Sequence, residues 1–149
     1  MPSRAEDPLV SFSFTLDIQG VVTGFFSEVS GLGSETEVID QKVMSPDGKA
    51  EIIRKIPGRM KWGDISLKRG ITDIMDVWTW RKMVEDGDIK GARKNGSIMM
   101  LNQSSEIVAQ WDFVNAWPSK VSGPQIQSDS NALGVEEMTI VHEGIKRIK

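Results

Sequence analysis

The only histidine, His142, is the side chain best suited to acid–base chemistry near neutral pH in this sequence. With Glu143 it begins the pattern of a zinc metalloprotease helix, but the second histidine of that pattern is missing. No serine lies in the glycine-flanked turn that would present it as a nucleophile. We therefore expect His142 to be an ordinary residue at the end of a strand.

Two further segments have only part of a ligand-binding pattern. Residues 31–34 are rich in glycine, but no lysine follows and no helix is expected there, so a bend between strands is favoured over a phosphate loop. Asp86 and Asp88 flank Gly87, but the spaced oxygen ligands of a calcium loop are missing, which favours the end of a helix. The absence of cysteine excludes disulfides and thiolate zinc sites. We expect no enzyme, no metal site and no cofactor.

The composition is that of a soluble globular chain. The 149 residues, of which 39% are hydrophobic and 26% charged, are enough for one domain with one core, and we take residues 1–149 as that domain. A net charge of -3 gives no general attraction for nucleic acid, and the short basic clusters at 90–94 and 146–149 are expected to be solvated. We expect no specific nucleic-acid site. The sequence shows neither a secretory signal nor an apolar run long enough to cross a bilayer, so we expect no membrane segment.

Alternating apolar and polar residues predict a mainly β protein. In residues 11–18 every second side chain is apolar, which is typical of a half-buried strand. Residues 44–60 contain two turn signals and are predicted to form an extended polar loop or hairpin with little to bury. Trp117 and Pro118 are expected to end the strand that starts at 106. Further strands are predicted at 21–29, 35–43, 61–69, 97–101, 106–116 and 134–143.

One helix is predicted, over residues 73–86. Thr72 or Asp73 can serve as its N-cap, and Gly87 ends it. Trp78 and Trp80 lie two positions apart, so they point to nearly opposite sides of the helix. One of them is expected to anchor the helix on the sheet. The other, for which we take Trp80, is free to contact a second subunit.

The ordered set of motifs resembles the tube proteins of contractile phage tails and of extracellular contractile injection systems, and more distantly the haemolysin-coregulated tube protein of type VI secretion. The stretch at 111–120 is the most specific, and the motifs together span nearly the whole chain. They lie at residues 14–18, 24–32, 56–58, 65–72, 77–81, 93–97, 111–120 and 142–144.

The resemblance implies two packed antiparallel sheets that form a split β-barrel with one flanking helix. It also implies a structural subunit that assembles as hexameric rings, stacked helically around a central channel. Such a tube conveys DNA or protein effectors when a surrounding sheath contracts. The implied partners are further copies of the chain, a sheath protein, baseplate or spike proteins, a terminal cap and the payload. Assembly would take place in the cytoplasm, before the chain becomes part of a phage tail or a released particle.

Site residues follow from the same resemblance. The extended loop at 44–60 is expected to contact a neighbouring subunit or ring. Acidic side chains on the helix are expected to face the sheath through weak ion pairs. The strand face with Ser11, Ser13, Thr15 and Asp17 is one candidate for the channel lining. The inter-subunit candidates are Asp47, Lys49, Glu51, Arg54, Arg59 and Trp80, and the sheath-facing candidates are Asp73, Asp76, Glu85 and Asp86.

Two other classes of protein remain as alternatives. A small-ligand-binding β-barrel would need a continuous apolar interior, whereas residues 44–60 form a polar segment. An enzyme would have to depend on His142. Particle mass separates the first alternative from a tube protein, because a binding barrel is expected to be a monomer or a dimer.

Overall fold

The computed structural model describes residues 12–20, 22–124 and 134–149. They fall into two compact units. One unit is Gly33–Gly63, and the other combines the chain before it with the chain from Asp64 onward. Ser11, one candidate for the channel lining, lies outside the described residues.

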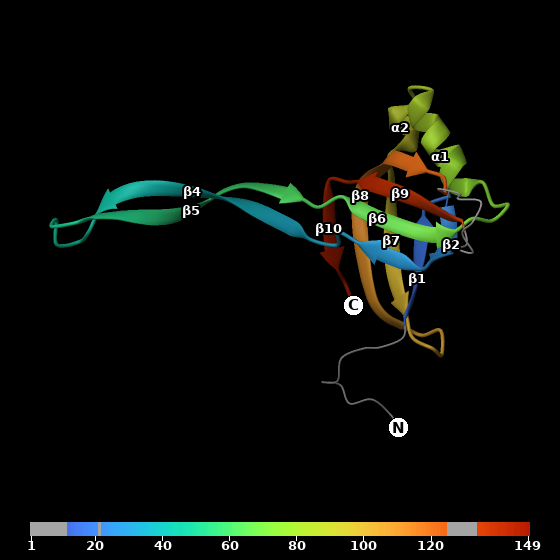
Figure 1. Cartoon of the computed structure of the whole chain (residues 1–149), viewed down its shortest axis with the longest axis horizontal. Coiled ribbons are helices and arrows are strands. Elements are labelled where there is room, and N and C mark those ends of the chain that lie inside the picture. Colours follow the sequence, from blue (N-terminus) through green and yellow to red (C-terminus); the bar gives the residue numbers. More distant parts are fainter. Residues whose placement is uncertain (1–11, 21, 125–133) are drawn as a thin grey trace, which may run out of the picture. The chain divides into compact units, whose positions relative to one another are not determined.

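In its described residues, the larger unit forms an eight-stranded antiparallel sheet with two helices. Its strands are β1 (Ser13–Ile18), β2 (Val22–Phe26), β3 (Glu28–Ser30), β6 (Ile65–Gly70), β7 (Lys94–Leu101), β8 (Ile107–Ser122), β9 (Val135–Val141) and β10 (Gly144–Arg147). They follow the order β2-β1-β7-β8-β9-β6-β3, with β10 beside β8. The helices are α1 (Asp76–Glu85) and α2 (Ile89–Ala92). In Figure 1 the strands curl around a common interior and both helices lie at one end of it.

The first and last strands of this order belong to one bent stretch of chain. Only Ser27 separates β2 from β3, and its backbone N–H donates to the Lys68 carbonyl at 2.9 Å. The predicted single strand at 21–29 is therefore two strands, which pair with β1 on one side of the bend and with β6 on the other. This architecture is the split barrel that the sequence predicts.

The long strand β8 joins the two halves of the barrel. Its first half pairs with β7 and β10, and its second half pairs with β9. Asn115, at the junction, has a φ of 51°, and its backbone N–H donates to the Asn95 side chain. The predicted strand end at Trp117 and Pro118 is wrong. Pro118 lies inside β8 next to a register shift, where a missing N–H is tolerated.

The core is formed by inward-facing residues of the sheet and by one face of α1. The period of two predicted for β1 is confirmed, because Leu16 and Ile18 are buried and Ser13 and Asp17 are exposed. Packing is tight at Gly96, where an added Cβ would lie 2.6 Å from Ile18 Cδ1. The fully buried side chains include Leu16, Ile18, Ile65, Leu67, Val77, Trp80, Ile98, Phe113, Met138 and Ile140.

The second unit is a two-stranded antiparallel hairpin, β4 (Ser34–Met44) and β5 (Glu51–Trp62). The predicted extended loop at 44–60 is therefore mostly strand, and only residues 45–50 form the turn. The register shifts once, between Thr36 and Val38. The two ends meet, because the Gly63 N–H donates to the Gly33 carbonyl at 3.0 Å.

Candidate assembly surfaces

His142 has a structural position between β9 and β10. Its Nδ1 accepts a hydrogen bond from the Gly144 backbone N–H at 3.1 Å, and its ring lies 6.1 Å from that of Phe113. The acidic residues at the end of α1 also have local roles, since Asp88 Oδ1 accepts from the Gly91 N–H and caps α2. Among the described residues, no three acidic or histidine side chains are grouped to hold a metal ion.

The hairpin presents two faces of different character. Cross-strand partners share a face, and successive residues alternate between faces. One face places the pair Val43–Ile52 next to Gln41–Arg54 and then Ile39–Ile56. We call the four apolar residues of this face, Ile39, Val43, Ile52 and Ile56, the Ile52 strip. An added Cβ at Gly58 would lie 3.0 Å from the Ile39 side chain, so Ile39 lies over Gly58 and extends the strip.

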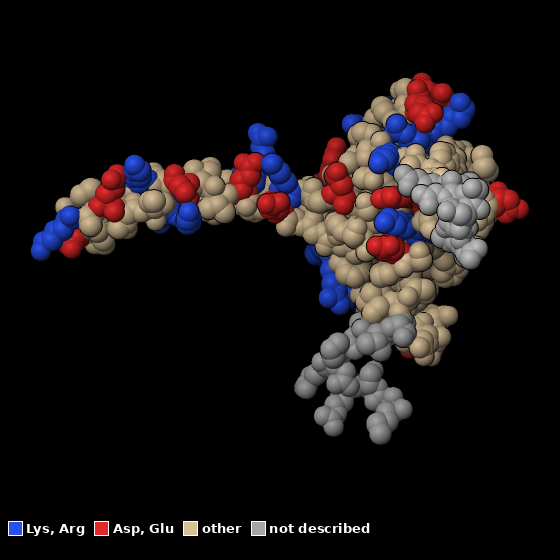
Figure 2. Space-filling view, viewed as in Figure 1, with Lys and Arg blue, Asp and Glu red and all other residues tan. Residues whose placement is uncertain are grey.

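The opposite face is mixed. It places Ile53 beside Lys42, and it carries the Asp40–Lys55 ion pair at 2.6 Å. Lys61 also pairs with Glu37, at 2.9 Å. Figure 2 shows both signs of charge interspersed along the hairpin. Because these pairs are well exposed, each is worth about 0–1 kcal/mol.

The tip of the hairpin is ordered by its own hydrogen bonds. Ser45 Oγ donates to Asp47 Oδ1, which also accepts from the Lys49 N–H at 3.0 Å. These bonds, the Ser45 bond first, lower the pKa of Asp47. Gly48 takes the positive φ of 72° that the turn requires. The turn therefore holds the Lys49 side chain at a defined exposed position.

All five predicted contact residues of the hairpin are exposed. Asp47 and Lys49 lie in the turn, and Glu51 begins β5. Arg54 lies on the face of the Ile52 strip, opposite Gln41. Arg59 lies in β5 next to the register shift. Each can contact another chain without any rearrangement of the hairpin.

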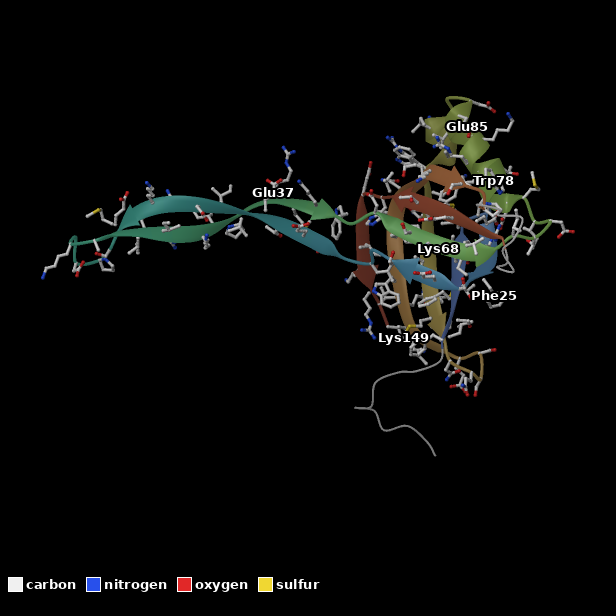
Figure 3. The ribbon with its side chains drawn as sticks, in the orientation of Figure 1. Phe25, Glu37, Lys68, Trp78, Glu85 and Lys149 are labelled. Atoms are coloured by element: carbon white, nitrogen blue, oxygen red, sulfur yellow. The ribbon has the colours of Figure 1, made fainter. Side chains whose placement is uncertain are left out.

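The prediction for Trp80 as a surface contact is wrong. Its side chain is 0% exposed, and its Nε1 donates to the Ala92 carbonyl at 2.7 Å. Trp78 is half-buried and donates from Nε1 to Glu136 Oε2 at 2.8 Å (Figure 3). Both tryptophans therefore fix α1 to the rest of its unit. Spacing alone shows that the two tryptophans point in different directions, but it does not show that α2 and β9 cover both of these sides of α1.

The helix starts later than the sequence predicts. Met75 occupies the N-cap position without a side-chain hydrogen bond, while Thr72 Oγ1 accepts from the Ile74 N–H in the preceding turn. The predicted end is confirmed, since Gly87 has a φ of 86°. Local capping chemistry favours a start at Thr72 or Asp73, but the pairing of Asp76 with a buried arginine determines where α1 begins.

That arginine, Arg69, forms the centre of a buried ionic cluster. Its Nη2 lies 2.5 Å from Asp76 Oδ1, and its Nε lies 2.5 Å from Glu136 Oε1. The guanidinium also lies 5.1 Å from the ring centroid of Phe26. Burial disfavours its charged form, but the bonds to Asp76 and Glu136 outweigh this effect and raise the pKa of Arg69. The cluster joins β6, β9, β2 and the start of α1.

The four candidate sheath-facing residues do not form one acidic surface. Asp76 is turned inward to Arg69 and is only 13% exposed, so it cannot face a sheath. Glu85 is exposed at the end of α1 (Figure 3) and lies 3.6 Å from Arg81, and Asp86 lies 3.6 Å from Lys82. Asp73 is exposed in the segment before α1. Three of the four therefore stay accessible, and two of these have cationic neighbours.

The barrel interior is filled by side chains, and the described hydrogen bonds of the polar residues serve strands, turns and helix ends. Within the described residues, no helix is long and apolar enough to cross a membrane. A family model of the T4-like virus tail tube protein gp19 matches residues 10–146, and the chain belongs to this family.

Solved structures share the fold. A chain of the sheath–tube complex of an extracellular contractile injection system, PVC, is 21% identical with a TM-score of 0.78, and the match covers 96% of this chain and 93% of the other. A chain of the six-fold symmetrised baseplate of the anti-feeding prophage is 18% identical (TM-score 0.73, coverage 96% and 97%). Hcp1 from Flavobacterium johnsoniae is 16% identical (TM-score 0.55, coverage 91% and 94%). No curated protein matches the sequence. The chain is a tail tube protein, and it is not an enzyme.

Proposed function

We propose that this chain assembles as hexameric rings that stack into the inner tube of a contractile injection machine, with the β4–β5 hairpin as a main contact between subunits. The tube surrounds a channel through which DNA or protein effectors pass when an outer sheath contracts. A sheath protein, baseplate or spike proteins and a terminal cap complete the particle, which assembles in the cytoplasm before release. Family membership and the fold shared with a chain of a six-fold baseplate support this assembly.

The observation that carries the proposal is the exposure of the hairpin. An isolated two-stranded hairpin is marginally stable in water, because it has no second layer to cover its apolar side chains. Here β4 and β5 have 11 and 12 residues and carry the Ile52 strip, in which Ile39 and Ile52 are exposed and Val43 and Ile56 are half-buried. Among the described residues, none of those in the core cluster or packed against it lies between 33 and 63. The hairpin would therefore gain stability by contacting another chain.

Asp47, Lys49, Glu51, Arg54 and Arg59 remain the candidates for polar contacts of the hairpin. Asp73, Glu85 and Asp86 remain candidates for sheath contact. Such contacts between exposed charges are individually weak, which suits a sheath that has to slide along the tube. The small-ligand alternative is not favoured, because Leu16, Trp80, Phe113 and their neighbours fill the barrel interior.

The proposal is tested by electron microscopy and particle mass at high protein concentration. The full chain should give rings of six copies and hollow tubes. A shortened variant, in which a two-residue turn replaces residues 35–61, should keep its circular dichroism and its cooperative unfolding, because Gly33 and Gly63 already meet. It should form no long tubes. Normal tubes from the shortened variant would refute the role of the hairpin, and a full chain that stays monomeric in its native particle would refute tube formation.

A further inference from the structure

A second apolar surface lies on the larger unit, around Phe25. Residues from β1, β2 and the segment between β6 and α1 enclose a groove of about 730 Å³. Phe25, on β2, is 68% exposed (Figure 3). Ile71 and Ile74 also line the groove and are exposed. We call it the Phe25 groove; its lining residues are Thr15, Gly24, Phe25, Phe26, Ser27, Arg69, Gly70, Ile71, Thr72 and Ile74.

The groove also contains a polar atom that needs a partner. The hydroxyl of Thr15 is buried, and no hydrogen-bond partner for it is found among the described residues. A buried hydroxyl without a partner costs about 1–3 kcal/mol of folding free energy. Arg69, by contrast, already pairs with Asp76 through Nη2 and with Glu136 through Nε. The groove thus offers mainly apolar side chains, which suits an apolar segment of polypeptide.

On this basis, and resting on the proposed function, we infer that the Phe25 groove of one subunit receives the Ile52 strip of the hairpin from a second copy of this chain. The strip and the groove both expose apolar side chains, Ile39 and Ile52 on the hairpin and Phe25, Ile71 and Ile74 on the larger unit. Two different surfaces that bind each other form a head-to-tail contact, which repeats from copy to copy and generates rings or filaments. Gln41 and Arg54, between the two apolar pairs of the strip, provide polar groups.

Charge supports the same pairing. Residues 33–63 contain six basic and five acidic residues, whereas the rest of the chain contains twelve basic and sixteen acidic residues. The hairpin is therefore slightly positive and the remainder of the chain clearly negative. Locally, Arg54 lies within the strip, and Asp73 is exposed between Thr72 and Ile74, which both line the groove. Opposite charges favour a hairpin of one copy over the larger unit of another.

Adjacent isoleucines provide a matched test of the strip. Ile52 is 43% exposed on the strip, and its neighbour Ile53 is 60% exposed on the opposite face. Ile52→Asp should raise the critical concentration for tube formation about tenfold or more, because it removes an apolar contact from every interface. Ile53→Asp should change it less than about threefold. An equal or larger effect of Ile53→Asp would overturn the assignment of the strip.

The groove has a matched pair as well. Ile74 is 54% exposed at the groove, and Ile148 is 52% exposed near the C-terminus. Ile74→Asp should again raise the critical concentration about tenfold, whereas Ile148→Asp should not. Circular dichroism and urea unfolding of all four variants establish that each folds. If Ile148→Asp has the larger effect, the groove is not the docking surface.

Because the chain has no cysteine, cross-linking can identify the contact directly. Assembled mixtures of an Ile52→Cys chain and an Ile74→Cys chain, treated with a short bismaleimide, should give a cross-linked dimer that contains one of each. Mixtures of Ile53→Cys with Ile74→Cys should give far less. Cross-links of Ile52→Cys chains with themselves would show hairpin-to-hairpin docking. In a chain that carries both Ile52→Cys and Ile74→Cys, a cross-link found only within one chain would show that the hairpin covers the groove of its own chain. Either this result or hairpin-to-hairpin docking overturns the inference.

Electron microscopy of the same samples separates the inference from the proposed function. Normal tubes without the link between positions 52 and 74 would refute the docking surface and leave the tube intact. Absence of tubes from the unmodified chain in its native particle would instead refute the proposed function.

Discussion

Replacing Arg69 by methionine should destabilise the subunit far more than the loss of any exposed charge. The Arg69 side chain is 8% exposed and forms ion pairs with Asp76 and Glu136, both at 2.5 Å. Without the cation, the Glu136 side chain, which is 3% exposed, keeps only the Trp78 Nε1 donor among its described hydrogen bonds. Methionine fills most of the volume of the arginine side chain, so the lost free energy of unfolding comes mainly from the carboxylates that stay buried.

The expected loss of unfolding free energy follows from the cost of breaking a buried ion pair. Removing one partner of such a pair costs about 3–5 kcal/mol, because the remaining charge has no compensation. In a chain of this size each kcal/mol lowers the midpoint of thermal unfolding by about 2–4 °C. We therefore expect Arg69→Met to lower that midpoint by about 6–20 °C. Urea denaturation followed by circular dichroism, at concentrations below those of assembly, measures the free energy itself.

Arg147 provides the matched control. It also lies over an aromatic ring, 5.6 Å from the centroid of Trp111, but it is exposed. Arg147→Met should cost no more than about 1 kcal/mol, the value for exposed cation–π contacts. Equal losses for the two variants would refute the argument, since burial of the carboxylates would then carry no weight. Adding Glu136→Gln and Asp76→Asn to Arg69→Met should restore part of the loss, because no uncompensated charge then remains buried.

Three further outcomes are expected. Trp80→Ala should cost about 3–5 kcal/mol of unfolding free energy in urea, because it empties a fully buried site; a fully stable variant that fails only in assembly would contradict its core position. Gly96→Ala should cost about 1–3 kcal/mol in the same assay, because its Cβ would overlap the Ile18 side chain, and an unchanged midpoint would count against this packing. The pKa of Asp47 should lie below 3.8 in an NMR titration. The hydrogen bonds of the turn therefore persist above that pH and are lost as the pH falls through the lowered pKa. A titration midpoint at or above 3.8 would disprove the hydrogen bonds from Ser45 and Lys49.

Local periodicity predicts much of this fold, because each strand of the barrel has one face inside and one outside. The alternation in β1 places Leu16 and Ile18 in the core as expected. The same reasoning fails at Pro118, whose missing N–H is usually a reason to end a strand. The register shift beside it removes the need for that donor, and the shift arises where β8 pairs with β9, whose residue Ile140 is the partner of Pro118. Such distant pairing leaves no local signal in the sequence.

The buried cluster was also beyond prediction from local pattern. Arg69 follows Ile65 and Leu67 at a spacing of two, which indicates that it points inward. Glu136 precedes Met138 and Ile140 in the same way. Each residue alone is a charged side chain at a position where the alternation predicts an apolar one. Two inward-facing residues of opposite charge on paired strands are the signal that could have identified the ion pair. Reading this signal requires the knowledge that β6 pairs with β9.

If the chain assembles as proposed, the layout of the hairpin would limit non-specific association of its exposed apolar residues. Apolar residues of the Ile52 strip occur in pairs separated by Gln41 and Arg54, so the exposed area is divided. Asp40, Lys42, Glu51 and Lys55 are interspersed with apolar residues on the opposite face, and such charges discourage pairing of strand edges with foreign chains. A correct partner has to cover two short apolar stretches and also satisfy the polar residues between them. This requirement favours a second copy that presents a fitting groove over non-specific association, and it makes the stability of the hairpin depend on assembly.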